Sequence, residues 1–69
     1  MNNNIFLIET GKKIREMRKS KKMTLQKLFE LTGIARDNLS RIEAGKKNFH
    51  ILTLKTIADV LKVDVKDFL

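Results

Sequence analysis

The sequence predicts a compact all-α domain of five short helices. Apolar residues recur three and four positions apart along most of the chain, which is the period of an amphipathic helix. The 69 residues include only three Gly, no Pro and no Cys, so the turn signals of β-rich folds and the cysteines of disulfide or zinc scaffolds are missing. A chain of this size buries about 60% of its extended surface, which supports one modest core. We therefore expect a single domain spanning residues 1–69, with residues 1–7 as a flexible or loosely packed N-terminal segment.

The first two helices are predicted on either side of a capping residue. Ile14 and Met17 mark the apolar face of a first helix over residues 8–21. Thr24 follows and can cap a second helix with its hydroxyl. Gly33 tolerates the positive φ that a tight turn after this helix requires. The apolar residues of the second helix are Leu25, Leu28 and Leu31.

A third helix is predicted over residues 36–44, and Gly45 should end it in a left-handed conformation. Its inward stripe is expected to consist of Ala35, Leu39 and Ile42. The opposite face then presents polar side chains to solvent, in the way that a helix lying in a major groove offers them to base edges.

The fourth helix has the clearest amphipathic pattern in the chain. A last turn should begin at Asp64, since Asp67 three residues later completes an acidic variant of the capping box. The apolar residues of the fourth helix are Ile51, Leu54, Ile57, Ala58 and Leu61.

Charge divides the chain into two parts. Twelve of the fifteen Lys and Arg residues lie between Glu9 and Lys47 with five acidic residues, so this segment carries the whole net charge of +7. The rest of the chain is neutral and rich in apolar residues. Such a basic surface favours nucleic acid as a partner, and the neutral end indicates a second surface with another role.

Residues 11–69 resemble the lambda-repressor-like (Xre/Cro) family of helix-turn-helix DNA-binding proteins. The resemblance is carried by residues 11–18, 23–28, 32–34, 40–47 (SRIEAGKK) and 53–63. It implies a five-helix fold in which the second and third helices form the helix-turn-helix. It places the second helix on the DNA backbone and the third in the major groove. The smallest members of the family include restriction-modification controller proteins.

The resemblance also implies roles for individual residues. Arg18 and Glu43 should form a partly buried ion pair. Two roles stay open for Asp37, which either reads a base or stabilises the helix start through the helix dipole. Base reading is expected from the outward face of the third helix, namely Arg36, Asp37, Ser40 and Arg41. Contacts with the DNA backbone are expected from Thr24, Gln26, Lys27, Asn38, Lys46 and Lys47.

Four positions depart from the family pattern. Leu25 stands where the family has a phosphate-contacting Gln, so this contact falls to Gln26 or to backbone amides. Phe29 replaces a small Ala and should alter the packing angle of the two helices. Ala35 and His50 replace Ser or Thr caps, each a loss of about 1 kcal/mol.

The expected function is a sequence-specific transcriptional regulator that binds double-stranded DNA as a homodimer. Its operator should be roughly two-fold symmetric, with half-sites about 34 Å apart. The protein should be autoregulatory, and is expected to act as a repressor or as a restriction-modification controller. The apolar residues Val65, Phe68 and Leu69 are expected at the dimer interface, although Phe68 and Leu69 could instead close the core. The alternative function is an antitoxin that binds a toxin and represses its own operon.

Other function classes find little support in the sequence. We expect no enzyme, because the lone His50 has no neighbouring nucleophile and no glycine-rich phosphate loop exists. No metal, cofactor, small-molecule ligand or membrane partner is expected either. The four apolar residues 5–8 are too few for a signal-peptide core, and a cytoplasmic protein of bacterial or phage origin is therefore expected.

Overall fold

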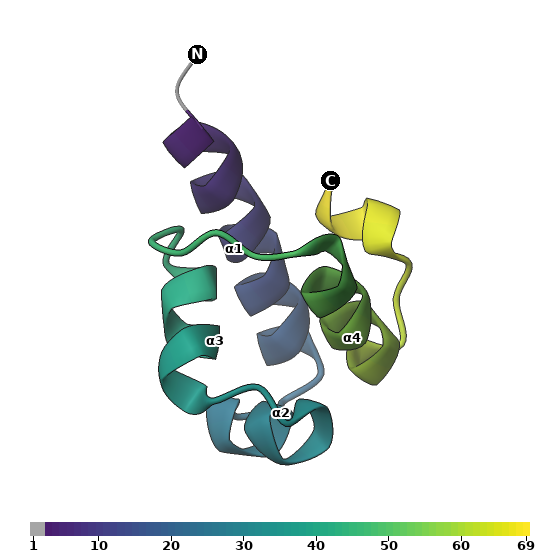
Figure 1. The fold of residues 1–69 in the computed structure, drawn as a ribbon. Helices are drawn as coiled ribbons and strands as arrows, with labels where there is room; N and C mark the ends of the chain where they lie inside the picture. The colour runs from purple at the N-terminus through teal and green to yellow at the C-terminus, as the bar shows by residue number, and fades with distance from the viewer. Residues whose placement is uncertain (1–2) are drawn as a thin grey trace.

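Four α-helices and a terminal 3-10 helix make up residues 3–69, the part of the chain that the computed structural model describes (Figure 1). The helices are α1 (Asn3–Ser20), α2 (Leu25–Thr32), α3 (Arg36–Glu43), α4 (Ile51–Leu61) and η1 (Val65–Phe68). The predicted all-α class is confirmed. The count of five helices is slightly off, because the last element is a short 3-10 helix.

Helix α1 begins earlier than the sequence analysis predicts. It starts at Asn3, and Leu7 is only 8% exposed. Leu7 lies one heptad before the fully buried Ile14, so both side chains fall on the same face and the helix gains packing by extending. Residues 3–7 thus belong to α1, in which Leu7 is buried while Ile5 and Phe6 are exposed. The loose packing expected for residues 1–7 stays a prediction, and residues 1–2 lie outside the described part of the chain.

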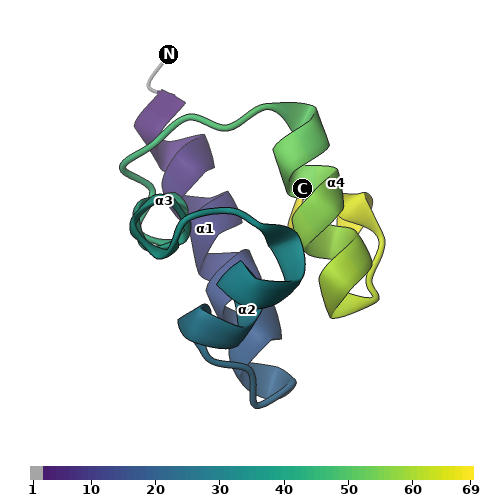
Figure 2. The same cartoon turned by 60° about the horizontal axis from the view of Figure 1, so that its bottom comes forward.

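The core is formed by one face of every helix (Figures 1 and 2). Helix α1 packs against α3 and η1, while α2 packs against α3 and α4. The buried residues at the centre are Ile14, Leu28, Leu39, Ile42, Leu54, Ile57, Ala58, Leu61 and Phe68. No helix within the described residues combines the length and the apolar character that crossing a membrane requires.

Several apolar residues lie elsewhere than the periodicity predicts. Ala35 is exposed because it precedes α3 in an extended conformation, with ψ at 142°, and so does not share the inward face of the helix. Ile51, the first residue of α4, is 62% exposed, and Leu31 on α2 is also exposed. Phe68 is 1% exposed and completes the core. Its assignment to a dimer interface is therefore wrong, since a second chain cannot reach it.

Side-chain and backbone caps define where the helices begin and end. The Thr24 hydroxyl accepts a hydrogen bond from the Lys27 backbone N–H at 3.0 Å. Gly33 ends α2 with φ at 76°, and its N–H donates to the Phe29 carbonyl at 2.8 Å. The capping box at the start of η1 is present, since the backbone N–H of Asp64 donates to an Asp67 carboxylate oxygen at 3.1 Å.

Candidate nucleic-acid interface

The outward face of α3 gathers the four residues that were predicted to read bases. Arg36, Asp37, Ser40 and Arg41 are all exposed, on the side of the helix opposite the buried Leu39 and Ile42. Asp37, Ser40 and Arg41 line one shallow hollow of about 420 Å³. Arg36, Asp37 and Ser40 line a second of about 380 Å³. The structure thus brings two guanidinium groups, a carboxylate and a hydroxyl together on one short helix.

A buried ion pair orients α3 relative to α1. The Arg18 Nε donates to the Glu43 Oε2 at 2.7 Å, and the Arg18 Nη2 donates to the Glu43 Oε1 at 3.0 Å. The Arg18 Nη1 donates to the carbonyl oxygen of Met23 at 2.7 Å. The two side chains are only 9% and 6% exposed. Arg18 therefore joins α1, the turn before α2 and the end of α3 through one group with fixed geometry.

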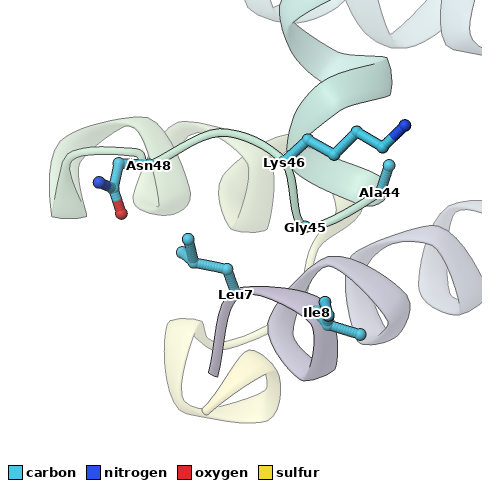
Figure 3. A pocket seen from close by; sticks show the side chains of 6 residues that line it. All are labelled: Leu7, Ile8, Ala44, Gly45, Lys46 and Asn48. Atoms are coloured by element: carbon cyan, nitrogen blue, oxygen red, sulfur yellow. The ribbon is translucent and has the colours of Figure 1, made fainter. Parts of the chain in front are cut away.

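Glycine permits the close approach of α1 and the end of α3. A Cβ atom on Gly11 would lie 2.7 Å from the Glu43 carbonyl oxygen, and one on Gly45 would lie 2.6 Å from the Ile8 Cα. Gly45 also has φ at 74°, a conformation that favours glycine. The chain thereby turns sharply after α3, and the side chain of Lys46 extends away from Leu7 of α1 (Figure 3).

The predicted DNA-backbone residues fall into two groups. Thr24, Gln26 and Lys27 lie at the start of α2, where all three are exposed. The Gln26 amide donates to the Glu30 carboxylate at 3.2 Å, and the second N–H of this amide is a further donor that can contact phosphate. Its neighbour Lys27 makes a capping hydrogen bond with its backbone N–H alone, which leaves the ammonium group free to act separately.

The second group consists of one residue of α3 and two residues in the loop after it. Asn38 and Lys47 are half-buried and line a hollow of about 190 Å³ between α3 and the start of α4. Lys46 is exposed. The predicted backbone contacts thus lie at the start of α2, within α3 and in the loop that follows α3.

Arg15 is a candidate that the sequence analysis did not assign to the site. This exposed residue of α1 lines a hollow of about 340 Å³ together with Leu25, Ser40 and Ala44. Its position was readable in principle, because it lies one helical turn before Arg18, whose side chain reaches α3. By contrast, the Lys13 ammonium group donates to the Leu69 carbonyl oxygen at 3.3 Å, at the C-terminal end of the chain.

Metal chemistry receives no support from the side-chain arrangement. Over the described residues, no three His, Cys, Asp or Glu side chains lie close enough together to hold a metal ion. The hollow in Figure 3, of about 510 Å³, is lined by Leu7, Ile8, Ala44, Gly45, Lys46 and Asn48.

Comparisons with known proteins agree with this geometry. A helix-turn-helix family, HTH_3, matches residues 14–68. An uncharacterized HTH-type transcriptional regulator of Bacillus subtilis, RghRB, is 35% identical over 60 residues, which are 86% of this chain and 43% of that protein. The chain thus spans about two fifths of the length of this relative.

Two solved structures share the fold. The restriction-modification controller protein C.AhdI from Aeromonas hydrophila superposes with a TM-score of 0.95 over 100% of both chains, at 22% identity. An HTH_3 family transcriptional regulator from Vibrio cholerae superposes with a TM-score of 0.90 at 28% identity, over 97% of this chain and 38% of that chain. Because the family match covers most of the chain and includes α2 and α3, this protein belongs to the HTH_3 family of helix-turn-helix proteins, as its resemblance to the lambda-repressor-like regulators implied.

Proposed function

We propose that the protein is a transcriptional regulator that binds double-stranded DNA sequence-specifically, with α3 in the major groove. The observation that carries this proposal is the exposed face of α3, where Arg36, Asp37, Ser40 and Arg41 lie together. Arginine is the commonest bidentate reader of guanine in the major groove, and a carboxylate can accept from cytosine. The buried pair of Arg18 and Glu43 supports this role, since it holds the reading face in one orientation.

Positive charge around α3 supplies the affinity that does not depend on sequence. The net charge is +7, and Lys27, Lys46 and Arg15 lie exposed on the elements that border α3. A helix inserted in the major groove passes between two phosphate backbones, so cations on both sides of it match the geometry of the duplex. Contacts with phosphates position the protein, while the α3 side chains discriminate between sequences.

We further propose that the protein binds a roughly two-fold symmetric operator as a homodimer. Because Phe68 belongs to the core and Val65 is half-buried, the interface must use other apolar side chains. Leu69 is 57% exposed, and Ile51 and Leu52 in the first turn of α4 are 62% and 73% exposed. The C-terminal end lies beside the first half of α4 in both views (Figures 1 and 2), so these residues can contribute to one self-complementary surface.

An autoregulatory role of the controller type is the regulatory function that we favour. The likeness in fold to the C.AhdI controller over the whole chain supports it. Binding to adjacent half-sites would make occupancy depend on the concentration of the protein, because dimerisation and DNA binding are thermodynamically linked. If the protein is instead an antitoxin, it should form a complex with a toxin, and its affinity for DNA should change when the toxin is added.

A selection of bound sites from a random duplex library tests the whole proposal. The full chain should enrich a palindromic sequence with half-sites about one helical turn, or about 34 Å, apart. The matched control is the variant carrying Arg36→Ala and Arg41→Ala, which should enrich no sequence while it retains salt-dependent binding. If the unaltered protein enriches nothing, or prefers the selected duplex no more than a scrambled one, the proposed function is wrong.

A further inference from the structure

We propose that Leu25, Ser40 and Ala44 form a contact site for a pyrimidine C5-methyl group in the major groove, and that Leu25 is therefore a specificity-determining residue. The inference rests on the proposed function and adds to it the chemical feature that one part of the surface recognises. It concerns α2, the helix that was expected to contact only the DNA backbone.

Leu25 places an apolar side chain beside the polar face of α3. It is the first residue of α2, and its side chain is half-buried. Part of it packs against the core, while the remainder lines both hollows that it shares with Ser40. A leucine side chain cannot donate a hydrogen bond to phosphate. Its exposed part can therefore contact an apolar group of DNA but cannot donate to the DNA backbone.

The hollow that contains Ala44 combines apolar and polar side chains. Its volume is about 340 Å³, and Leu25 from α2 lines it together with Ser40 from α3 and Ala44, the residue that follows α3. The buried ion pair of Arg18 and Glu43 also lines this hollow. All three nitrogens of that guanidinium already donate hydrogen bonds within the protein. Apart from the exposed Arg15, this surface thus offers a base two aliphatic side chains and one hydroxyl.

Arg15 lines the same hollow and provides its cationic border. The exposed guanidinium can contact a phosphate next to the base that enters the hollow, since Arg binds phosphate oxygens bidentately. This combination is complementary to a nucleotide, in which the base lies next to a negatively charged phosphate. The hollow is therefore suited to a nucleotide that carries an apolar substituent on its major-groove edge.

One group on the major-groove edge of DNA meets this description. Thymine carries a methyl group at C5, which proteins recognise by apolar contact, next to its O4 acceptor. The Ser40 hydroxyl can donate to that O4 while Leu25 and Ala44 contact the methyl group. A 5-methylcytosine presents the same methyl group with an amino donor in place of O4, and a hydroxyl can accept from it. The shared chemistry is the C5-methyl group.

Replacing thymine by uracil tests the site, because uracil lacks only the C5-methyl group. Competition gel shifts use the duplex enriched in the selection, with single uracil substitutions in one half-site. At one thymine, we expect uracil to weaken binding of the unaltered protein about fourfold, the factor that corresponds to one buried methylene-sized group. Leu25→Ala should bind the thymine and uracil duplexes equally at this position. Leu25→Met, which keeps an apolar contact, should restore part of the difference.

A second set of duplexes distinguishes the two sources of the methyl group. The identified T·A pair is replaced by C·G, with and without a methyl group at cytosine C5. An increase in affinity on methylation that Leu25→Ala abolishes identifies 5-methylcytosine as a second ligand of the site. No response to methylation restricts the site to thymine and leaves the uracil result intact.

Leu31→Ala is the matched control, since it truncates an exposed leucine of the same helix that lines neither hollow. It should retain the uracil penalty of the unaltered protein, and thermal melts of all variants report whether they are folded. The inference is overturned if no uracil substitution weakens the unaltered protein, or if folded Leu25→Ala keeps the same penalty at every thymine. Failure of the proposed function differs from both results, because the selected duplex would then have no advantage over a scrambled one.

Discussion

Replacing Glu43 by alanine should remove most of the stability of the domain. The Arg18 guanidinium makes two hydrogen bonds to this carboxylate, at 2.7 and 3.0 Å, and a third to the Met23 carbonyl at 2.7 Å. The variant would leave a 9% exposed guanidinium side chain with one hydrogen-bond acceptor. Breaking a buried pair from one side costs about 3–5 kcal/mol. A domain of this size has a total stability of roughly 3–10 kcal/mol, so the loss is comparable with the whole.

Urea denaturation followed by circular dichroism at the helix band measures this loss. The free energy of unfolding should fall by about 3–5 kcal/mol for Glu43→Ala. The matched variant carries Arg18→Met together with Glu43→Leu, which removes both charges and fills the site with apolar side chains. Replacing both partners in this way is often neutral or stabilising, so most of the stability should return.

The double variant also separates stability from DNA binding. If it is as stable as the unaltered protein, any loss of affinity reports the orientation of α3 rather than unfolding. A loss of less than about 1 kcal/mol for Glu43→Ala would refute the reasoning, since a pair of that strength behaves like one on the surface. The burial and the hydrogen bonds of the Arg18–Glu43 pair would then not determine its contribution to the free energy of unfolding.

The remaining predictions concern DNA binding and assembly. Arg36→Ala and Arg41→Ala should each cost about 1–3 kcal/mol on the selected duplex in gel shifts, and equal losses on a scrambled duplex would make them phosphate contacts instead. Lys46→Ala should weaken binding to all duplexes alike and reduce the salt slope by about one unit, so an unchanged slope would exclude a phosphate contact. Leu52→Glu should shift sedimentation towards the monomer without lowering the melting temperature, because this side chain is 73% exposed. A persistent dimer would place the interface elsewhere.

Local patterns in the sequence predicted much of the helix-turn-helix. The spacing of Leu39 and Ile42 identified the inward side of α3, and the structure buries both. Thr24 and Gly33 were predicted to begin and end α2 from their side-chain chemistry and conformational freedom, and they do so. These features depend on residues within one or two helical turns, so an isolated stretch of sequence contains the information.

Other features depend on contacts between distant segments. Periodicity placed Ile51 inside, whereas it is exposed at the first position of α4, at the edge of the stripe that the buried Leu54, Ile57 and Leu61 form. Phe68 reaches the core because η1 packs against α1 and α4. Arg15 and Leu25 come beside Ser40 only when α1, α2 and α3 pack together. These outcomes depend on how the helices pack together and not on spacing within one helix alone.

The sequence by itself determined the helical class, the family resemblance and the polar face of α3, since each depends on residue type and short-range spacing. Only the tertiary structure decided which apolar side chains remain exposed and which residues of α1 and α2 border that face. The physical reason is that the burial of a side chain, and the groups that lie beside it on the surface, depend on contacts between segments that are far apart in the chain. Leu25, next to Thr24, is ambiguous in the sequence, and its place beside Ser40 in the folded domain is the reason why we propose a role in recognition.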